Sequence, residues 1–514
     1  MSRDLGSCRQ GAQNPDPSAC PHRASAARDG ARDDNEWMAL GLWPEASSQE
    51  LAARSCPFMD LKNKRVLVVG LGKSGVASAL FLQARGAHVT VSDAKPQDQL
   101  GEDIPTLLDH GIAVETGGHG ERTFRGQDLI VVSPGVPVDS PPLVQARALG
   151  EPVIGEIELA SQFLPKNIVA ITGSNGKTTT TTLAGEIVTA GGFPTVVGGN
   201  IGTPAISLVE QARPDTVVVL EVSSFQLETI ETFRPKIAVV LNITPDHLDR
   251  HRTFTAYTDA KARIFENQQA EDFAVLNADD AASAGLAART RSQVFWFSRR
   301  QEVKQGAYVH AGRVLFRDQA GQREVMLVSE IPLKGAHNVE NTLAAVCVGA
   351  LMRCETGRIR QAVRNFQAVE HRLEYVATIR GVEYYNDSKA TNVDATIKAL
   401  ESFPANVHLI LGGKDKDSDY TLLNDLLRQR VKRVYTIGAA AGKIESQIKD
   451  VEVDHAETLE TALRHAAGTA DAGDIVLLAP ACASFDQFQN YEHRGRVFKE
   501  VVRALAAEAK HEPR

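Results

Sequence analysis

The sequence has few cysteines, no long apolar run and no strong excess of either charge. Its 514 residues contain six cysteines, none spaced as C-x-x-C, which argues against a disulfide framework and against structural zinc. No apolar run could cross a bilayer, and the first residues lack the basic-then-apolar pattern of a secretory signal. The formal net charge of −8 argues against general binding to nucleic acid. We therefore expect a cytoplasmic protein without membrane insertion, in which local lysines can still meet a small anionic substrate.

The chain is too long for one hydrophobic core, and a prior of about 150 residues per domain suggests roughly three domains. From Lys64 onward, short apolar runs such as RVLVVG, NIVAITG and VHLILGG alternate with helical stretches. This alternation is typical of parallel α/β sheets. We predict an N-terminal extension followed by three domains, with the ranges 1–58, 59–155, 156–368 and 369–514.

The first 58 residues differ from the rest of the chain. They contain six Arg and no Lys, clusters of Pro, Ser and Ala, and no sustained hydrophobic period. Such a stretch cannot bury enough apolar surface to offset its loss of conformational entropy, so we predict a disordered extension. One hypothesis is that translation starts at Met59 instead; peptides from before Met59 in the mass spectrum of the native protein would contradict it.

The segment ITGSNGKTTTTT, residues 171–182, ends like a phosphate-binding loop but does not begin like one. The usual pattern needs a glycine five places before Gly176, and Ile171 stands there. A strand, two glycines and a helix are nevertheless in the right order for backbone N–H groups and a helix N-terminus to meet phosphate. We predict that Lys177 reaches the β- and γ-phosphates of a nucleotide and that Thr178 binds Mg²⁺.

Three further polar residues follow apolar strands or lie on a helix of the same region. Glu221 closes the run VVVLE, His247 follows VVLNITPD, and Lys261 lies in the helical stretch TAYTDAKARIFEN. A carboxylate at a strand end is suitably placed to bind Mg²⁺. Each residue also has a plainer interpretation, as a solvent-facing acid, a structural histidine and a solvated lysine respectively.

Near the start of the ordered chain, VVGLGKSG satisfies the G-x-G-x-x-G dinucleotide pattern, and Asp93 follows 18 residues after Gly75. Alone, this motif predicts an NAD or FAD enzyme. The same geometry serves any nucleotide diphosphate, and the sequence shows no sign of a site for a hydride acceptor. The motif therefore leaves the nature of the nucleotide open.

Five segments together resemble the Mur ligase family, the ATP-dependent amide-bond-forming enzymes of peptidoglycan synthesis: TGSNGKTTT, GGNIGTP (198–204), EVSSFQLE (221–228), TPDHLDRH (244–251) and KGAHNVENTLAA (334–345). The shortened loop T-G-x-N-G-K-T is the family's form. The resemblance begins at Met59 and implies an N-terminal Rossmann-like domain, a central P-loop domain with a parallel sheet, and a C-terminal Rossmann-like domain. The segments GLGKSG, YNDSKATN (385–392) and APACASFDQFQNYEHRG (479–495) are most similar to the members that add D-glutamate.

The resemblance implies a cytoplasmic, monomeric ligase of peptidoglycan precursor synthesis. Its substrates would be UDP-N-acetylmuramoyl-L-alanine, D-glutamate and ATP, and an acyl phosphate would form before the amide bond. The family uses two Mg²⁺ ions and a lysine carbamylated by CO₂. A carbamate is sensible there, because it converts an ammonium group that would repel Mg²⁺ into an anionic oxygen ligand.

The family's roles can be transferred to the matching positions. The resemblance implies ATP contacts at Gly173, Ser174, Asn175, Gly176, Lys177, Thr178, Thr179, Asn338, Asn341, Arg372 and Asp387. It implies catalytic groups at Lys177, Glu221, His247 and Lys261, and metal ligands at Thr178, Glu221, His247 and Lys261. It implies contacts to the UDP-linked substrate at Gly72, Ser74, Asp93, Ser133, Gly135 and Asn200. It implies a D-glutamate site at Lys389, Thr391, Lys416, Ser484 and Tyr491.

The sequence departs from the family pattern at two of these positions. Tyr491 stands where a phenylalanine is common, and the loop GGKDK, which carries Lys416, is less rich in glycine than its usual form. Three alternatives remain: a related ligase for another amino acid or folate, a redox enzyme built on GLGKSG, and a non-catalytic nucleotide switch. The segments DSKATN and SFDQF argue against the first alternative.

Overall fold

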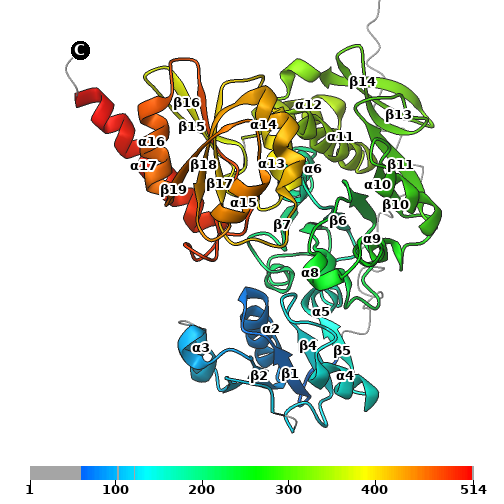
Figure 1. Ribbon diagram of the computed structural model, residues 1–514. Helices are drawn as coiled ribbons and strands as arrows, with labels where there is room; N and C mark the ends of the chain where they lie inside the picture. The colour runs from blue at the N-terminus through cyan, green and yellow to red at the C-terminus, as the bar shows by residue number, and fades with distance from the viewer. Residues whose placement is uncertain (1–58, 101–102, 121, 368, 512–514) are drawn as a thin grey trace, which may run out of the picture. The chain divides into compact units, whose positions relative to one another are not determined.

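The computed structural model of the chain describes residues 59–100, 103–120, 122–367 and 369–511. The predicted disordered extension, residues 1–58, lies outside these ranges. Three β-sheets, which follow one another along the chain, organise the described residues. The central strands of each sheet are largely buried and apolar, and helices pack against them (Figure 1).

The first sheet has the strand order β3-β2-β1-β4-β5, and all its strands run parallel. Because β2 and β4 flank β1, the strand order reverses between β1 and β4. The loops after these two strands lie at this switch point, where such folds bind ligands. The strands are β1 Arg65–Val69, β2 His88–Ser92, β3 Ala113–Glu115, β4 Leu129–Val132 and β5 Val153–Gly155. The helices are α2 Lys73–Ala84, η2 Gln97–Gln99, α3 Asp103–Asp109 and α4 Pro141–Ala148.

The second sheet has the order β14-β13-β12-β11-β10-β9-β6-β8-β7, with strands parallel from β7 to β12. The strands are β6 Ile168–Thr172, β7 Thr195–Gly199, β8 Val217–Glu221, β9 Ile237–Val240, β10 Phe273–Asn277, β11 Gln293–Ser298, β12 Gly306–His310, β13 Arg313–Asp318 and β14 Gly321–Leu327. The helices are α5 Glu156–Ser161, α6 Lys177–Ala190, η3 Ala205–Leu208, α7 Ser224–Leu227, α8 Leu248–His251, α9 Phe254–Ala262, η4 Arg263–Phe265, α10 Ala281–Gly285, η5 Leu286–Arg289, η6 Val328–Glu330, α11 Ala336–Leu351 and α12 Thr356–Asn365.

The third sheet has the order β15-β16-β20-β17-β18-β19 and is parallel except for the pair β15 and β16. Its strands are β15 Glu374–Ile379, β16 Val382–Asn386, β17 Val407–Gly412, β18 Val431–Ile437, β19 Glu452–Glu457 and β20 Ile475–Leu478. Its helices are α13 Val393–Glu401, η7 Tyr420–Leu423, α14 Asn424–Arg430, α15 Ala441–Gln447, α16 Leu459–Thr469 and α17 Tyr491–His511.

Successive residues of the central strands in this third sheet face opposite hydrophobic cores. Leu409 and Leu411 of β17 pack in a core with residues of α13, α14 and α15, whereas Ile410 packs in a core with residues of α16 and α17. Helices therefore cover both faces of the sheet. This explains why the strands read as continuous apolar runs instead of alternating polar and apolar residues.

The structure confirms the predicted α/β class with three parallel-sheet domains. It also contains antiparallel strands that the sequence analysis did not predict. β12 connects to β13 through Ala311 and Gly312, which have positive φ angles of 48° and 74°. Two residues cannot make the crossover that a parallel pair needs, so the strands pair as a hairpin.

The predicted domain boundaries stay predictions. The strands of the three sheets span residues 65–155, 168–327 and 374–478, all inside the predicted ranges. None of the helices in the described part of the chain has both the length and the apolar character needed to cross a bilayer.

Candidate active site

The phosphate-binding loop connects β6 to α6 in the middle of the second sheet. Ile171 lies inside β6, fully buried and paired with Glu221 of β8, so the turn of the chain begins only at Gly173. Gly176 has a φ of 87°, and a Cβ atom there would lie 2.2 Å from Oδ1 of Asn341. The position where the usual motif has its first glycine is therefore strand in this protein, and the loop turns on Gly173 and Gly176.

The ammonium group of Lys177 lies over this loop. Its Nζ donates hydrogen bonds of 2.7 Å to the carbonyl oxygens of Gly173 and Ser174. Burial lowers its pKa, and the nearby carboxylates of Glu221 and Asp246 oppose that effect. Lys177 is thus held at the first turn of α6, where a helix N-terminus favours phosphate.

A buried carboxylate faces the start of the same helix. Oε2 of Glu221 accepts a 2.8 Å hydrogen bond from the Thr178 hydroxyl, and Oε1 accepts a 2.9 Å bond from the Asn200 side-chain amide. Burial acts to raise the pKa of Glu221, but the ammonium groups of Lys389 and Lys177 and the two hydrogen bonds hold it below its usual value. The carboxylate is therefore ionised, and Asn200, predicted to contact the UDP-linked substrate, lies against it.

Lys261 is buried, with 1% of its surface exposed, and is not the solvated lysine that its helical stretch alone suggests. Its Nζ donates a 2.9 Å hydrogen bond to the Gly173 carbonyl and lies 4.6 Å from the centre of the Tyr257 ring. Burial and the nearby Lys177 lower its pKa well below the ordinary value, although Asp246 and Glu221 oppose them. An amine in this environment is available in its neutral, nucleophilic form.

His247 precedes α8 in a left-handed conformation, with a φ of 52°. Its Nε2 lies 3.7 Å from Oδ2 of Asp246, and its ring meets that of Phe225 edge to face. Burial lowers the pKa of His247 to about 4, with Lys416 and Lys177 acting in the same direction against Asp246. The imidazole is therefore neutral near pH 7 and can act as a metal ligand.

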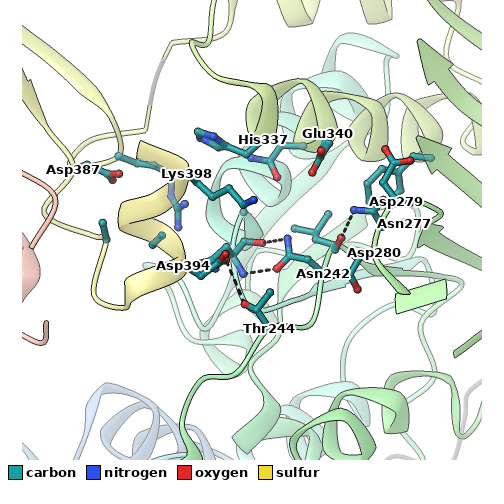
Figure 2. A pocket seen from close by; sticks show the side chains of 18 of the residues that line it. Asn242, Thr244, Asn277, Asp279, Asp280, His337, Glu340, Asp387, Asp394 and Lys398 are labelled. Atoms are coloured by element: carbon teal, nitrogen blue, oxygen red, sulfur yellow. Dashed lines mark hydrogen bonds between the residues drawn. The ribbon is translucent and has the colours of Figure 1, made fainter. Parts of the chain in front are cut away.

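A pocket lies beside the phosphate loop, and Figure 2 shows the side chains around it. It contains about 900 Å³ of space, including the part open to solvent. The pocket is lined by residues from the domain of the second sheet and from the segment 372–398. These residues are Asn175, Gly176, Leu241, Asn242, Thr244, Asn277, Asp279, Asp280, Phe297, Arg300, His337, Glu340, Asn341, Arg372, Asp387, Ala390, Asp394, Ala395 and Lys398.

Five of the predicted ATP contacts line this pocket: Asn175, Gly176, Asn341, Arg372 and Asp387. Asn338 acts differently: its amide donates a 2.7 Å bond to the Lys334 carbonyl, and its Oδ1 accepts a 3.0 Å bond from Asn341. Asn338 therefore orients Asn341.

Arg372 and Asp387 contribute opposite charges to the pocket. Nε of Arg372 is buried and has no hydrogen-bond partner within the part of the chain that the structure describes. Burial raises the pKa of Asp387 to about 6, although Arg372 opposes the shift. A buried donor without a partner suits an anionic or polar ligand oxygen, because leaving such a group unpaired is costly.

Several pocket residues escaped the sequence analysis. Asn242 exchanges two hydrogen bonds with the backbone of Asn175, of 2.8 and 3.0 Å. The side chain of Asn175 donates a 2.6 Å bond to Oδ2 of Asp394. The Thr244 hydroxyl donates to the same oxygen at 3.3 Å (Figure 2). Asp394 lies 219 residues from Asn175 in the chain, so no local pattern could relate the two.

Four of the predicted D-glutamate residues lie on three loops of the third domain, and Tyr491 is the first residue of α17. The Lys389 ammonium lies 5.2 Å from the centre of the Tyr491 ring and donates to the hydroxyl of Thr178. Burial lowers the pKa of Lys389 to about 8, against the pull of Glu221. Ser484 is buried and Thr391 half-buried. The positive charge of Lys416 acts on His247 and Asp246. Lys416, like Lys389, therefore lies near the residues around the phosphate loop.

The residues of the first domain that are predicted to bind the UDP-linked substrate form two groups. One group supports the glycine loop, and the other is accessible to a ligand. Oδ2 of Asp93 accepts a 2.7 Å bond from the Leu71 backbone, and the Ser133 hydroxyl donates at 2.8 Å to the Gly70 carbonyl. These two side chains brace the glycine loop. In contrast, Gly72 and Gly135 are exposed and Ser74 half-buried, so they remain accessible to a ligand.

One residue next to this loop was missed by the sequence analysis. Nδ1 of His119 lies 2.8 Å from the Ser92 hydroxyl, at the end of β2 and directly before Asp93. His119 belongs to the glycine-rich segment 117–120, and the run TGGHG was the only sequence signal that could have pointed to it.

Comparisons with known proteins agree with this arrangement. Family models match in chain order: the Mur ligase MurD-like N-terminal domain over residues 64–155, the Mur ligase middle domain over 171–349, and the Mur ligase glutamate ligase domain over 371–482. The UDP-N-acetylmuramoylalanine--D-glutamate ligase of Koribacter versatilis (strain Ellin345) is 67% identical over 452 residues, which cover 88% of this chain and 100% of that protein. The chain belongs to the Mur ligase family.

A second relative carries the same name as the first, and a solved structure of another Mur ligase has a similar fold. The UDP-N-acetylmuramoylalanine--D-glutamate ligase of Acidobacterium capsulatum is 60% identical over 449 residues, 87% of this chain and 97% of that protein. The crystal structure of the MurF ligase from Thermotoga maritima in complex with ADP has a TM-score of 0.56 at 17% identity, covering 87% of this chain and 99% of that one. At that identity the likeness concerns the fold alone.

Membership of the Mur ligase family confirms the resemblance seen in the sequence. The match of residues 64–155 to a Mur ligase N-terminal domain contradicts the alternative of a redox enzyme built on GLGKSG. The individual roles of the site residues stay predictions. Among the described residues, no group of three or more His, Cys, Asp or Glu side chains is gathered as a ready metal site.

Proposed function

We propose that this Mur ligase joins D-glutamate to the L-alanine carboxyl group of UDP-N-acetylmuramoyl-L-alanine and cleaves ATP to ADP and phosphate. The observation that carries the proposal is the 67% identity to a ligase of that name over that protein's whole length. A glutamate ligase domain over residues 371–482 supports the choice of amino acid. The reaction serves peptidoglycan precursor synthesis in the cytoplasm, where ATP and UDP-linked sugars are available, and the enzyme acts as a monomer.

ATP binds with its phosphates on the loop Gly173–Thr179 and its nucleoside in the adjoining pocket. The loop and the N-terminus of α6 present backbone N–H groups, and Lys177 adds a positive charge. Asn341, oriented by Asn338, is suitably placed to contact the base. Arg372 offers its Nε–H, which has no hydrogen-bond partner among the described residues, to a phosphate or ribose oxygen.

The residues around Glu221 fit a Mg²⁺ ion. The Glu221 carboxylate and the Thr178 hydroxyl supply hard oxygen ligands, and Asn200 fixes the second carboxylate oxygen. Mg²⁺ usually keeps several waters and binds through one or two carboxylates and substrate phosphates, so a larger protein cluster is not needed. Bound there, Mg²⁺ would neutralise charge on the phosphoryl group during its transfer.

We propose that Lys261 and His247 hold a second Mg²⁺ ion, with Lys261 as a carbamate. The neutral Lys261 amine attacks CO₂, a bond forms between Nζ and carbon, and one proton leaves to solvent. The product carries an anionic oxygen that suits Mg²⁺. The burial of Lys261 and the lowered pKa of its amine support this step, as does the neutral imidazole of His247.

The chain's own groups hold the reactants in line. Lys177 orients the γ-phosphate toward the L-alanine carboxylate, which attacks it and forms an acyl phosphate as ADP leaves. The D-glutamate amine then attacks the acyl carbon, the tetrahedral adduct expels phosphate, and the nitrogen releases one proton to the phosphate or to solvent as the amide forms. The buried Ser484 and the half-buried Lys389 limit the access of water, which would hydrolyse the acyl phosphate.

D-glutamate carries two carboxylates, and each needs a positive or hydrogen-bonding partner when it leaves water. Lys389 and Lys416 supply charge, and Thr391 and Ser484 supply hydroxyl groups. Tyr491 packs against Lys389. Its hydroxyl group, which a phenylalanine would lack, affects only this packing contact. On the first sheet, the loop braced by Asp93 and Ser133 holds the UDP end of the other substrate through Gly72, Ser74 and Gly135.

The test is phosphate release from ATP and Mg²⁺ with UDP-N-acetylmuramoyl-L-alanine and one amino acid at a time. D-glutamate is compared with L-glutamate, L-lysine and diaminopimelate. We expect turnover with D-glutamate alone. Turnover with a different amino acid would keep the ligase chemistry and overturn the substrate, and no turnover with any of them would overturn the proposed function.

A further inference from the structure

Two loops at one edge of the third sheet carry residues proposed to bind D-glutamate. The loop after β17 carries Lys416, and the loop after β20 carries Ser484; β17 and β20 are neighbours in the sheet. Between them, the backbones of Lys414 and Ala483 exchange hydrogen bonds of 2.8 and 3.1 Å. These two hydrogen bonds therefore fix the distance between the loops at a point close to Lys416 and Ser484.

A fully buried tyrosine joins the same two loops through its side chain. The Tyr420 hydroxyl donates a 2.7 Å hydrogen bond to Oδ1 of Asp415, the neighbour of Lys416. The same oxygen lies 3.0 Å from Sγ of Cys482, two residues before Ser484. Since the only hydroxyl proton points to Asp415, the oxygen accepts from the Cys482 thiol. Burial raises the pKa of that thiol to about 11, so it keeps its proton.

The Asp415 end of this connection is itself anchored. Oδ2 of Asp415 accepts a 2.7 Å hydrogen bond from Nζ of Lys443, and Oδ1 accepts a 3.1 Å bond from the Ser418 backbone. Burial acts to raise the pKa of Asp415, but Lys443 and Tyr420 hold it below its usual value, so the carboxylate stays ionised. Tyr420 therefore connects a fixed anion on one loop to a thiol on the other.

We propose that Tyr420 is a positioning residue for the amino-acid substrate. It does not touch D-glutamate; it holds the Lys416 loop and the Ser484 loop at the spacing that the substrate requires. This inference rests on the proposed function, because Lys416 and Ser484 are assigned to D-glutamate there. The consequence is that the Tyr420 hydroxyl affects D-glutamate binding and leaves ATP binding unchanged.

The decisive variant is Tyr420→Phe, which removes the hydroxyl and keeps the buried ring. The matched control is Tyr435→Phe. Tyr435 is also fully buried, and its hydroxyl lies 3.0 Å from His408 Nδ1 and 2.6 Å from Thr469 Oγ1. His408 lies at the start of β17, away from the substrate-binding loops. Both variants lose one buried hydroxyl from the same domain, so thermal unfolding of the two reports the shared structural cost.

For Tyr420→Phe we expect the KM for D-glutamate to rise about tenfold, equivalent to about 1.4 kcal/mol. We expect kcat and the KM for ATP to change less than about twofold, which is the signature of lost substrate binding alone. Tyr435→Phe should leave the KM for D-glutamate unchanged. Equal D-glutamate KM values in both variants, or a matching rise in the ATP KM for Tyr420→Phe, would overturn the inference.

The thiol end of the connection offers an independent check. Cys482→Ala should raise the KM for D-glutamate, and Cys482→Ser, which keeps a donor, should restore it. The double variant Tyr420→Phe with Cys482→Ala should bind D-glutamate no worse than Tyr420→Phe, because both changes break one connection. Fully additive effects would overturn the inference. The unmodified enzyme separates the two hypotheses: if it does not turn over D-glutamate at all, the proposed function itself fails.

Discussion

The hydroxyl of Thr178 donates a 2.8 Å hydrogen bond to Oε2 of Glu221, and the ammonium group of Lys389 donates to the same hydroxyl. Three segments that are distant in the chain thus meet at one oxygen atom: the phosphate loop, the end of β8 and the loop before α13. The carboxylate balances two lysines there, and this balance explains why Glu221 stays ionised although it is buried. The first prediction tests that charge.

Glu221→Gln keeps the size of the side chain and removes its negative charge. We expect kcat to fall about a hundredfold or more, the scale typical of losing one electrostatic contact to a transition state. Steady-state phosphate release measures the effect. Glu186→Gln is the control, because Glu186 is an exposed acid in the C-terminal half of α6, the helix that follows the phosphate loop. Activity close to that of the control would contradict the role of Glu221 in binding metal.

His247→Ala removes a neutral imidazole from the edge of the site. If His247 is a metal ligand, activity should fall at low Mg²⁺ and recover in part at high Mg²⁺, because mass action refills a weakened site. A titration of activity against Mg²⁺ measures this. His455→Ala, an exposed histidine on β19, should show the Mg²⁺ dependence of the unmodified enzyme. No recovery at any Mg²⁺ concentration would count against the role.

Lys261→Ala should abolish most activity and leave a cavity into which a small anion can diffuse. Formate or acetate should then restore part of the activity, because each supplies the anionic oxygen of the proposed carbamate. Activity measured over a concentration series of each salt tests this, with chloride at equal ionic strength as the reference. Lys236→Ala, with Lys236 paired to Asp272 away from the phosphate loop, should show no such response. Absence of rescue would weaken the carbamate hypothesis.

The buried carboxyl group of Glu156 should make the free energy of unfolding depend on pH. Oε1 of Glu156 accepts a 2.8 Å bond from the Ile206 backbone, whereas Oε2 is buried without a partner in the described residues. Burial raises the pKa of Glu156 from 4.5 to about 7. A raised pKa means that this group favours the folded state fully below pH 4.5, and that the contribution is lost as the pH rises to about 7.

Glu156→Gln removes the ionisation, so it should stabilise the protein at pH 8 relative to the unmodified chain. The difference should be on the order of 3 kcal/mol at most, from 1.36 kcal/mol per unit of pKa, and should shrink toward pH 5. Thermal unfolding across this pH range measures it. Glu158→Gln is the contrast, because Glu158 lies on the same helix and accepts backbone hydrogen bonds from Glu231, Thr232 and Phe233. That variant should be destabilised; a uniform effect of Glu156→Gln at every pH would contradict the prediction.

The sequence by itself determined the features that depend on neighbours in the chain. Strand, glycines, lysine and helix follow one another within residues 168–190, so a phosphate loop could be predicted although Ile171 replaces the usual glycine. The apolar run before Glu221 likewise placed this acid at a strand end. The order of rare motifs indicated the Mur ligase family, and the comparisons confirmed it.

Only the tertiary structure decided the features that depend on burial and on distant partners. The local sequence predicts that Lys261 is a solvated lysine on a helix. In the structure it is buried and donates to Gly173, 88 residues away in the chain. Asn200 rests on Glu221, and Asp394 on Asn175, through contacts that no local period encodes. The physical reason is that pKa and ligand geometry depend on desolvation and on charges brought together by folding, whereas local pattern depends only on backbone preference and hydrophobic spacing.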